Sequence, residues 1–302
     1  MPHLDSGIVT TPDEDTTIWR YMDFPKFMWT LQNSKMYFHR ADLFEDPFEG
    51  TVPAYVKRIR EEEYEKRHEE DEDFPEDMDE IHAELSRTLR QFTFLSCWHI
   101  NERESAAMWE LYGESGKAIA LKTTIGGLIN AFDAHPDHDI HIGKVDYDIY
   151  KGGEEEAQEA PEAFLLTEGA NSMAPFFRKR ESFSHEREVR AVIQIPPVLS
   201  DDEQFPYLDY NMVIGGDERK EKIKIYAGDE QRTVDTTEDP KTTGINVSVH
   251  LDRLIDKVHI APYAADWFAD TVEQAVEECE DIEVDDDVDI TERSNLDANP
   301  LF

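Results

Sequence analysis

Apolar runs of strand length recur along most of the chain, and segments with helical or highly charged patterns separate them. FTFLSCWHI at 92–100 reads as a buried strand, and KAIALKT at 117–123 reads as another. Between them, ESAAMWELYG has the pattern of a helix that ends at Gly113. No internal repeat occurs. This alternation predicts an α+β fold with a single domain, a mixed or antiparallel split sheet and inserted helices. Further strands are expected at 18–21, 35–39, 144–149, 183–195, 223–226, 245–249 and 257–260.

Helical patterns fill the longer intervals. We expect helices at 24–32, 163–180 and 264–279, and an acidic helical insertion at about 55–90 that Pro75 divides. Residues 133–143 are polar and read as a loop. A polar leader, residues 1–16, comes before the folded part. We therefore assign residues 17–302 to the domain.

The acidic excess of the chain limits its partners. The sequence has 69 Asp and Glu against 30 Lys and Arg, a formal net charge of -39, while 39% of its residues are hydrophobic and can form a core. An acidic surface repels nucleic-acid phosphates and anionic lipids over most of its area, which disfavours both as partners. The same charge is typical of a salt-rich cytoplasm, where ions screen self-repulsion. We expect a halophilic protein.

The sequence has no membrane or export signal that we can identify. No apolar run approaches the roughly 20 residues that span a bilayer. The N-terminal MPHLDSGIVTTPDEDTT lacks the basic and apolar regions of a signal peptide. These features predict a cytoplasmic protein without a membrane segment.

Metal-binding and common catalytic motifs are missing from the sequence. Cys97 and Cys279 lack metal-ligand spacing and are expected to be inert thiols. His135, His138 and His141 are three residues apart, but the segment is loop-like and contains a proline, so we predict no metal site. No glycine-rich phosphate loop, GxSxG, HExxH or CxxC pair is present.

One predicted strand carries charges that a buried strand does not need. In FSHEREVRAVIQI (183–195), Glu186, Glu188 and Arg190 share one face if the segment is extended, and apolar side chains share the other. These charges could form a ladder on a half-exposed strand. However, like charges two residues apart repel each other unless a cation, a ligand or a water-filled cleft lies nearby. Arg190 and the basic run 178–180 could supply the cation in either interpretation.

Two other segments combine anchoring and functional residue types. DLFEDPFEG (42–50) alternates carboxylates with phenylalanines, and Pro47 favours a rigid turn. In SCWHINERESAAMWELYG, Trp98 ends a strand, Ser105 can cap a helix, and helical core packing explains the rest.

Seven blocks occur in order along the chain: WRYMDFPKF, YFHRADLFEDPFEG, SCWHINERESAAMWELYG, KAIALKT, FRKRESFSHEREVRA, LIDKVHIAPYAADWF and ERSNL. Together they resemble the prokaryotic family of unknown function numbered 2971. The resemblance covers about residues 18–296, and the acidic insertions look like a haloarchaeal surface adaptation. The family name carries no activity.

A weaker resemblance connects the chain with ADP-ribosyltransferases. Their motifs are a basic or histidine residue on an early strand, a serine or aromatic residue on a middle strand, and a glutamate, often in ExE, on a late strand. The resemblance implies NAD as substrate and an ADP-ribosyltransferase-like fold. The matching residues here are Arg20 with Tyr21, Ser96 with Trp98, and Glu186 with Glu188.

The resemblance also assigns roles. Glu188 would stabilise the oxocarbenium-like ribose formed when nicotinamide leaves, and Glu186 would orient or activate the acceptor. Arg20 would hold a ribose hydroxyl or the phosphates, and Tyr21 or Trp98 would stack on a base. Arg190, counted among the cofactor-binding candidates, could instead pair with Glu188 and fix its rotamer.

Three hypotheses follow. The first is an NAD-using transferase or NAD-cleaving enzyme, such as a defence effector, with a small molecule or other acceptor as partner. The second is a non-catalytic binding or regulatory module in which the carboxylates and arginines form a structural network. The third is a metal-dependent nuclease or hydrolase built on Asp46, Glu49, Glu186 and Glu188.

Overall fold

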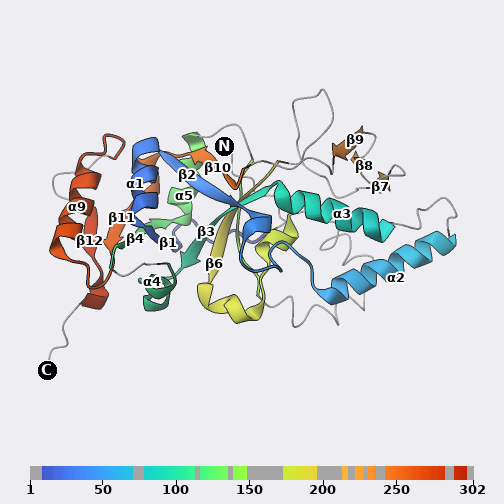
Figure 1. Cartoon of the computed structure of the whole chain (residues 1–302), viewed down its shortest axis with the longest axis horizontal. Helices are drawn as coiled ribbons and strands as arrows, with labels where there is room; N and C mark the ends of the chain where they lie inside the picture. Colours follow the sequence, from blue (N-terminus) through green and yellow to red (C-terminus); the bar gives the residue numbers. More distant parts are fainter. Residues whose placement is uncertain are drawn as a thin grey trace.

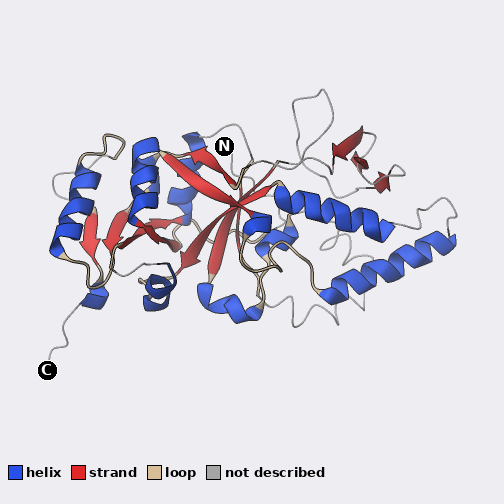
Figure 2. Cartoon of the chain, in the orientation of Figure 1, coloured by secondary structure: helices blue, strands red, loops and turns tan. Residues whose placement is uncertain are grey.

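The computed structural model describes residues 9–70, 78–112, 116–134, 139–147, 173–195, 213–216, 222–227, 230–235, 242–282 and 289–297. A mixed sheet of nine strands lies at its centre (Figures 1 and 2). The α+β fold class is therefore confirmed. The strands are β1 (Thr17–Asp23), β2 (Lys35–Arg40), β3 (Thr93–Ile100), β4 (Ala118–Thr124), β5 (His141–Lys144), β6 (Glu188–Gln194), β10 (Gly244–Ser248), β11 (Lys257–Ile260) and β12 (Thr291–Arg293).

The sheet branches at β3. One path runs β10-β2-β3-β1-β4-β11-β12, while β6 pairs with the other edge of β3 and β5 pairs with β6. All pairs are antiparallel except β11 with β12. Strands β7 (Val213–Gly216), β8 (Lys222–Ala227) and β9 (Glu230–Asp235) form a separate antiparallel sheet.

Helices cover one face of the central sheet and build the main core. Helices α1 (Phe24–Asn33), α5 (Ile125–Ala131) and α9 (Asp266–Glu277) pack their apolar residues against Ile18, Trp98, Val189 and other strand residues. Helix α1 begins where Asp23 accepts a hydrogen bond from the Lys26 backbone N–H at 2.8 Å, which satisfies one free donor of the first turn. The short helix α8 (Leu251–Leu254) completes this layer.

The opposite face is covered in two separate places. Helix α4 (Ala106–Tyr112) packs on Trp19 and Tyr21 of β1, and the 3-10 turn η4 (Ala174–Phe177) packs on Leu95 of β3. Helices α2 (Ala54–Glu70) and α3 (Met78–Gln91) lie side by side and extend away from the sheet (Figure 1). Among the described residues, no helix combines the length and apolarity that a bilayer crossing requires.

The sheet contains an opening along one edge of β3. Strand β1 pairs with β3 only at Ile18 with Ile100 and at Trp19 with His99, and β2 pairs only at His39 with Leu95 and at Arg40 with Phe94. The intervening residues 96–98 have no strand partner on this edge. In contrast, β1 pairs with β4 along its whole length. Strands β1 and β3 therefore diverge, and the predicted split in the sheet lies here.

Most predicted elements are confirmed within a few residues, but three predictions were wrong. The strand expected at 144–149 is β5, which begins three residues earlier. In its described part, the expected loop 133–143 therefore contains the end of the 3-10 turn η2 (Phe132–Ala134) and residues 141–143 of β5. The helix expected at 163–180 is only the short turn η4 within its described part, and residues 163–172 lie outside the described residues. Glu186 ends the 3-10 turn η5 (Glu181–Glu186) and precedes the strand, which begins at Glu188.

Some predictions fall outside the described residues or remain untested. Pro75, His135 and His138 are outside, whereas His141 is buried on β5. The domain boundary at residue 17 stays a prediction, although Thr11 already donates a hydrogen bond to the Ile142 carbonyl at 2.7 Å.

Candidate functional site

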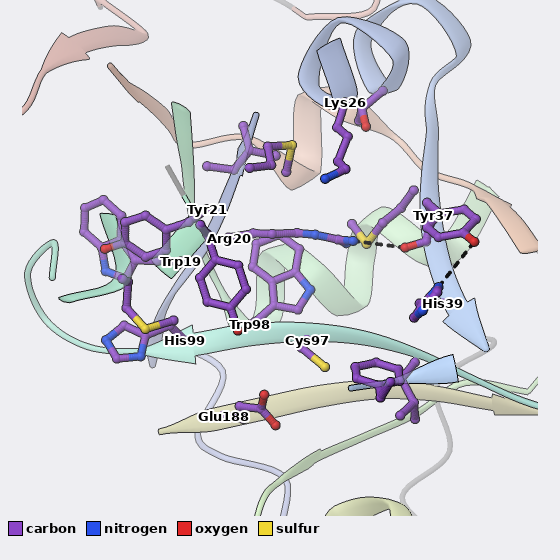
Figure 3. A pocket seen from close by; sticks show the side chains of 18 of the residues that line it. Trp19, Arg20, Tyr21, Lys26, Tyr37, His39, Cys97, Trp98, His99 and Glu188 are labelled. Carbon is purple, nitrogen blue, oxygen red and sulfur yellow. Dashed lines mark hydrogen bonds between the residues drawn. The ribbon is translucent and has the colours of Figure 1, made fainter. Parts of the chain in front are cut away.

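A cavity of about 780 Å³ occupies the opening between β1 and β3. Because the two strands separate here, side chains from both faces of the sheet reach the same space. Arg20, Trp98, His99 and Glu188 all line it, as does Lys26 from α1 (Figure 3). Aromatic rings make up much of the remaining wall: Trp19, Tyr21, Trp29, Tyr37, Phe44 and Tyr112.

Arg20 crosses the opening from β1. Its Nη1 donates to Ser96 Oγ at 2.5 Å and its Nη2 to the Tyr37 carbonyl at 3.0 Å, while its Cζ lies 5.7 Å from the ring centroid of Trp98 (Figure 3). The Trp98 Nε1–H also donates to Ser96 Oγ, at 3.2 Å. The hydroxyl oxygen of Ser96 therefore accepts hydrogen bonds from both side chains and fixes the positions of the Arg20 guanidinium and the Trp98 indole.

Among the described residues, the guanidinium of Arg20 has neutral partners only. No described carboxylate forms an ion pair with it. Loss of hydration in the protein interior lowers the pKa of Arg20 to about 10, so the group stays cationic at neutral pH. A poorly hydrated cation without a counter-charge on the wall of a cavity favours an anionic ligand.

Glu188 is held from two sides on β6. Arg190 Nε donates to its Oε2 at 2.7 Å, and Lys179 Nζ lies 3.3 Å from its Oε1. Burial alone would raise the pKa of Glu188, but the charges of Arg190 and Lys179 outweigh burial and lower the pKa to about 2. Glu188 is therefore a carboxylate at neutral pH, although its exposed fraction is only 5%.

Arg190 lies behind Glu188, away from the cavity. It is fully buried, and it binds Glu49 through Nη1 at 2.5 Å and Nη2 at 3.2 Å and the Phe176 carbonyl at 2.6 Å. All of its guanidinium nitrogens thus have protein partners. The alternative in which Arg190 fixes the rotamer of Glu188 fits this geometry better than a direct contact with a ligand.

Glu186 is the last member of an ion cluster that also contains Glu49, Lys179, Glu188 and Arg190. It does not line the cavity. Its Oε2 accepts from Lys179 Nζ at 2.5 Å. Burial, and then the neighbouring Glu188 carboxylate, raise the pKa of Glu186 to about 7, despite the opposing effect of Lys179. With a proton on Glu186, the carboxylates of Glu49 and Glu188 balance the charges of Arg190 and Lys179.

The ion cluster explains how the buried strand β6 can carry charged side chains, because each of them is paired inside the protein. Strand β6 is central, between β3 and β5, so a surface ladder is excluded and the charged face of the strand is inside the protein. The cations predicted to relieve the repulsion are Arg190 and Lys179. The remaining two carboxylates of the metal hypothesis also have cationic partners: Arg190 binds Glu49, and Arg180 Nη2 donates to Asp46 at 2.8 Å. In the described part of the chain, no group of three or more His, Cys, Asp or Glu is arranged to hold a metal ion.

The predicted site residues divide into two sets. Arg20, Tyr21, Trp98 and Glu188 line one cavity, as the resemblance requires. The hydroxyl oxygen of Tyr21 accepts a hydrogen bond from the Ser105 backbone N–H at 2.8 Å, and its ring packs edge-on against Trp109, so Tyr21 is held rigidly on β1. The members that lie behind the cavity wall are Ser96, Glu186 and Arg190.

Sequence reasoning did not identify His99 as a site residue. His99 lies directly opposite Glu188 in the β3–β6 register, on the same face of the sheet, and lines the cavity. The alternation in FTFLSCWHI places His99 with Cys97 on the face opposite Trp98. Only the pairing with β6 connects that face to Glu188, and local sequence does not encode the pairing.

The fold and the cavity define an α+β protein with a branched sheet and a cavity of about 780 Å³ between diverging strands. Residues 108–191 match the model of a family described as Protein of unknown function (DUF2971). The matched segment contains Glu186 and Glu188, and the match supports the resemblance to this family without adding an activity. No curated protein and no solved structure matches the chain.

Proposed function

We propose that this protein binds NAD in the cavity between β1 and β3 and breaks its nicotinamide–ribose bond, passing ADP-ribose to an acceptor or to water. One observation carries the proposal: an ionised carboxylate, Glu188, and a cation that no described carboxylate neutralises, Arg20, line one aromatic cavity. A dinucleotide offers the matching groups, namely a cationic sugar in the transition state, a diphosphate and two flat bases.

Glu188 addresses the charge that develops during the reaction. As neutral nicotinamide leaves, positive charge spreads over the ribose C1′ and ring oxygen. A carboxylate fixed close to that charge stabilises the transition state more than the ground state. Glycosidases solve a similar problem with carboxylates. Arg190 and Lys179 support this role because they hold the Glu188 side chain in place and keep it ionised.

Arg20 and the aromatic rings address binding. The guanidinium can donate to phosphate or ribose oxygens, and its stacking on Trp98 fixes its direction. The cavity volume of about 780 Å³ lies within the range of about 300–1,000 Å³ that is typical of small-molecule sites. Tyr21 or Trp98 is the candidate for stacking on a base.

A non-catalytic binding module is the second candidate, and a specific observation favours it. Both carboxylate oxygens of Glu188 already have cationic partners, as they would in a purely structural network. In that case Glu188 would matter for stability and ligand affinity only. The difference between the two candidates is therefore turnover.

The test is nicotinamide release from NAD by the full chain, measured in low and in high salt because of the acidic composition. We expect turnover in the wild type and a loss of at least about 100-fold in Glu188→Gln, which keeps the size of the side chain but removes its charge. Glu110→Gln removes an exposed carboxylate from α4 and is the matched control.

Three outcomes separate the candidates. Binding of NAD without turnover in the wild type supports the binding module. Neither binding nor turnover overturns the assignment to NAD. Turnover that survives Glu188→Gln, in a protein whose unfolding curve matches the wild type, removes Glu188 from the mechanism. We also propose that the protein works in the salt-rich cytoplasm of a halophile and that it is a defence effector.

A further inference from the structure

His99 has one ring nitrogen bound and one ring nitrogen without a partner. Nδ1 lies 2.6 Å from the backbone carbonyl oxygen of Glu186. A carbonyl only accepts, so Nδ1 carries the proton and Nε2 is the acceptor nitrogen of this tautomer. Nε2 is buried and forms no hydrogen bond within the described part of the chain. An unsatisfied buried acceptor is costly and is usually explained by a missing partner.

The position of His99 indicates what that partner is. The side chain is 3% exposed and lines the cavity. On the neighbouring strand, Glu188 is its direct cross-strand partner, which places their Cβ atoms about 4.5–5.5 Å apart. A group that meets Nε2 from inside the cavity is therefore close to the carbon atom that Glu188 would stabilise.

Glu186, the residue expected to activate the acceptor, is poorly placed for that task. Its carboxyl group is bound by Lys179 and does not line the cavity. Its backbone carbonyl instead orients the imidazole of His99. Glu186 thus positions His99 through its backbone carbonyl, and its own carboxyl group is not placed to act as the general base.

We propose that His99 is a further catalytic residue of the cavity, and that its Nε2 takes the proton from an acceptor with an O–H group, either water or an alcohol. This inference rests on the proposed function. The acceptor oxygen forms a bond to the ribose C1′ while the C1′–N bond to nicotinamide breaks. The bonding pair of that C–N bond leaves with nicotinamide, which is released neutral. The acceptor proton moves to Nε2 and then to solvent.

The surroundings keep the imidazole in its basic form. Burial is the largest influence and lowers the pKa of His99 below its usual 6.5, so the ring is neutral at pH 7 and can accept a proton. Activity should therefore rise with pH through a limb that lies below pH 6.5. The titratable or charged groups around the ring are Glu188, His185 and Arg187 from the β6 side and Tyr21 from β1.

The experiment compares the wild type with His99→Asn in the same nicotinamide-release assay. An asparagine amide can still donate to the Glu186 carbonyl but lacks an acceptor at the place of Nε2. We expect a fall of about 100-fold or more in turnover, the typical contribution of a general base, with NAD affinity changed less than about threefold. The limb below pH 6.5 should disappear. His259→Asn is the matched control: His259 is also buried, its ring nitrogens form no hydrogen bond among the described residues although Nε2 lies 3.9 Å from Glu292 Oε2, and it does not line the cavity.

The outcomes distinguish this inference from the proposed function. If the wild type turns over NAD and Glu188→Gln is inactive, but His99→Asn keeps its rate and its acidic limb, then His99 is not the base and only this inference falls. A wild type that neither binds nor cleaves NAD overturns both. Should His99→Asn lose its folded state by circular dichroism, His99→Gln in the same assays decides the question, because its amide oxygen can replace Nε2 as an acceptor but cannot take up a proton.

Discussion

Replacement of Arg190 by methionine tests the ion cluster most directly. Glu49 has Arg190 as its partner for both carboxylate oxygens, whereas Glu188 would keep Lys179. Glu49 is only 2% exposed, and in Arg190→Met no cation of the described residues would remain beside its carboxyl group. Removal of one member of a buried ion pair typically costs about 3–5 kcal/mol, because the other charge stays behind.

The magnitude can also be obtained from proton binding. A stranded Glu49 becomes neutral by taking up a proton, which costs about 1.36 kcal/mol for each pH unit above an unfolded-state pKa of about 4.3, or about 3.7 kcal/mol at pH 7 and about 1 kcal/mol at pH 5. The Phe176 carbonyl also loses its donor, which adds about 1 kcal/mol. We therefore expect the free energy of unfolding to fall by about 4–5 kcal/mol at pH 7 and by about 2 kcal/mol at pH 5.

The sign of the pH effect follows from linkage. In the variant, the folded-state pKa of Glu49 is raised above its unfolded value, so stability is present at low pH and is lost as the pH rises. Urea unfolding at both pH values, at one fixed salt concentration, measures the difference from the wild type. Glu49→Gln added to Arg190→Met should remove most of the pH dependence. The control is Arg253→Met, which removes an exposed ion pair with Asp133 and should cost less than about 1 kcal/mol.

A deficit below about 1 kcal/mol at pH 7, or one that does not change between pH 5 and pH 7, would refute the reasoning. Either result would mean that water or another cation reaches Glu49 when Arg190 is absent.

Three further predictions concern single residues. Arg20→Met should weaken binding of NAD and of ADP by at least about 10-fold in calorimetry. The free energy of unfolding should fall by no more than about 1–2 kcal/mol, because the substitution removes hydrogen bonds to neutral groups and leaves no described carboxylate without its cation. Because the pKa of Glu186 is raised to about 7, the stability that this residue contributes is lost as the pH rises from 4.5 to 7, and the advantage of the wild type over Glu186→Gln in the free energy of unfolding should shrink over that range in urea unfolding. Burial raises the pKa of Cys97 to about 12, and native protein should therefore resist iodoacetamide at this thiol at pH 8, with alkylation at Cys97 by mass spectrometry only after denaturation.

Local patterns predicted most elements because a strand or helix with one buried face has a readable period. The alternation of residues 188–194 placed Val189, Ala191 and Ile193 on the core side, and these residues do lie in the main core. The pattern failed at Glu186, where the chain turns at Arg187 with a φ of 42°. A left-handed non-glycine residue has no clear sequence signal, so the predicted strand 183–195 began five residues before β6 does.

The order of strands is a different kind of information. Arg20, Trp98 and Glu188 are far apart in the sequence, and their meeting depends on how β1, β3 and β6 pair. Sequence reasoning suggested the trio through a resemblance, but no periodicity requires it. His99 was overlooked for the same reason, since its neighbour on the sheet is almost 90 positions away along the chain.

By itself, the sequence determined which segments are extended or helical, which side of each strand is apolar, and that a buried strand must carry charged groups. The tertiary structure alone decided that these charges form an almost neutral cluster and that β1 leaves β3 after two residue pairs, which opens the cavity. The physical reason is the distance along the chain over which each interaction acts. Hydrophobic periodicity acts between residues a few positions apart, whereas ion pairing and strand register join residues that only the completed sheet brings together.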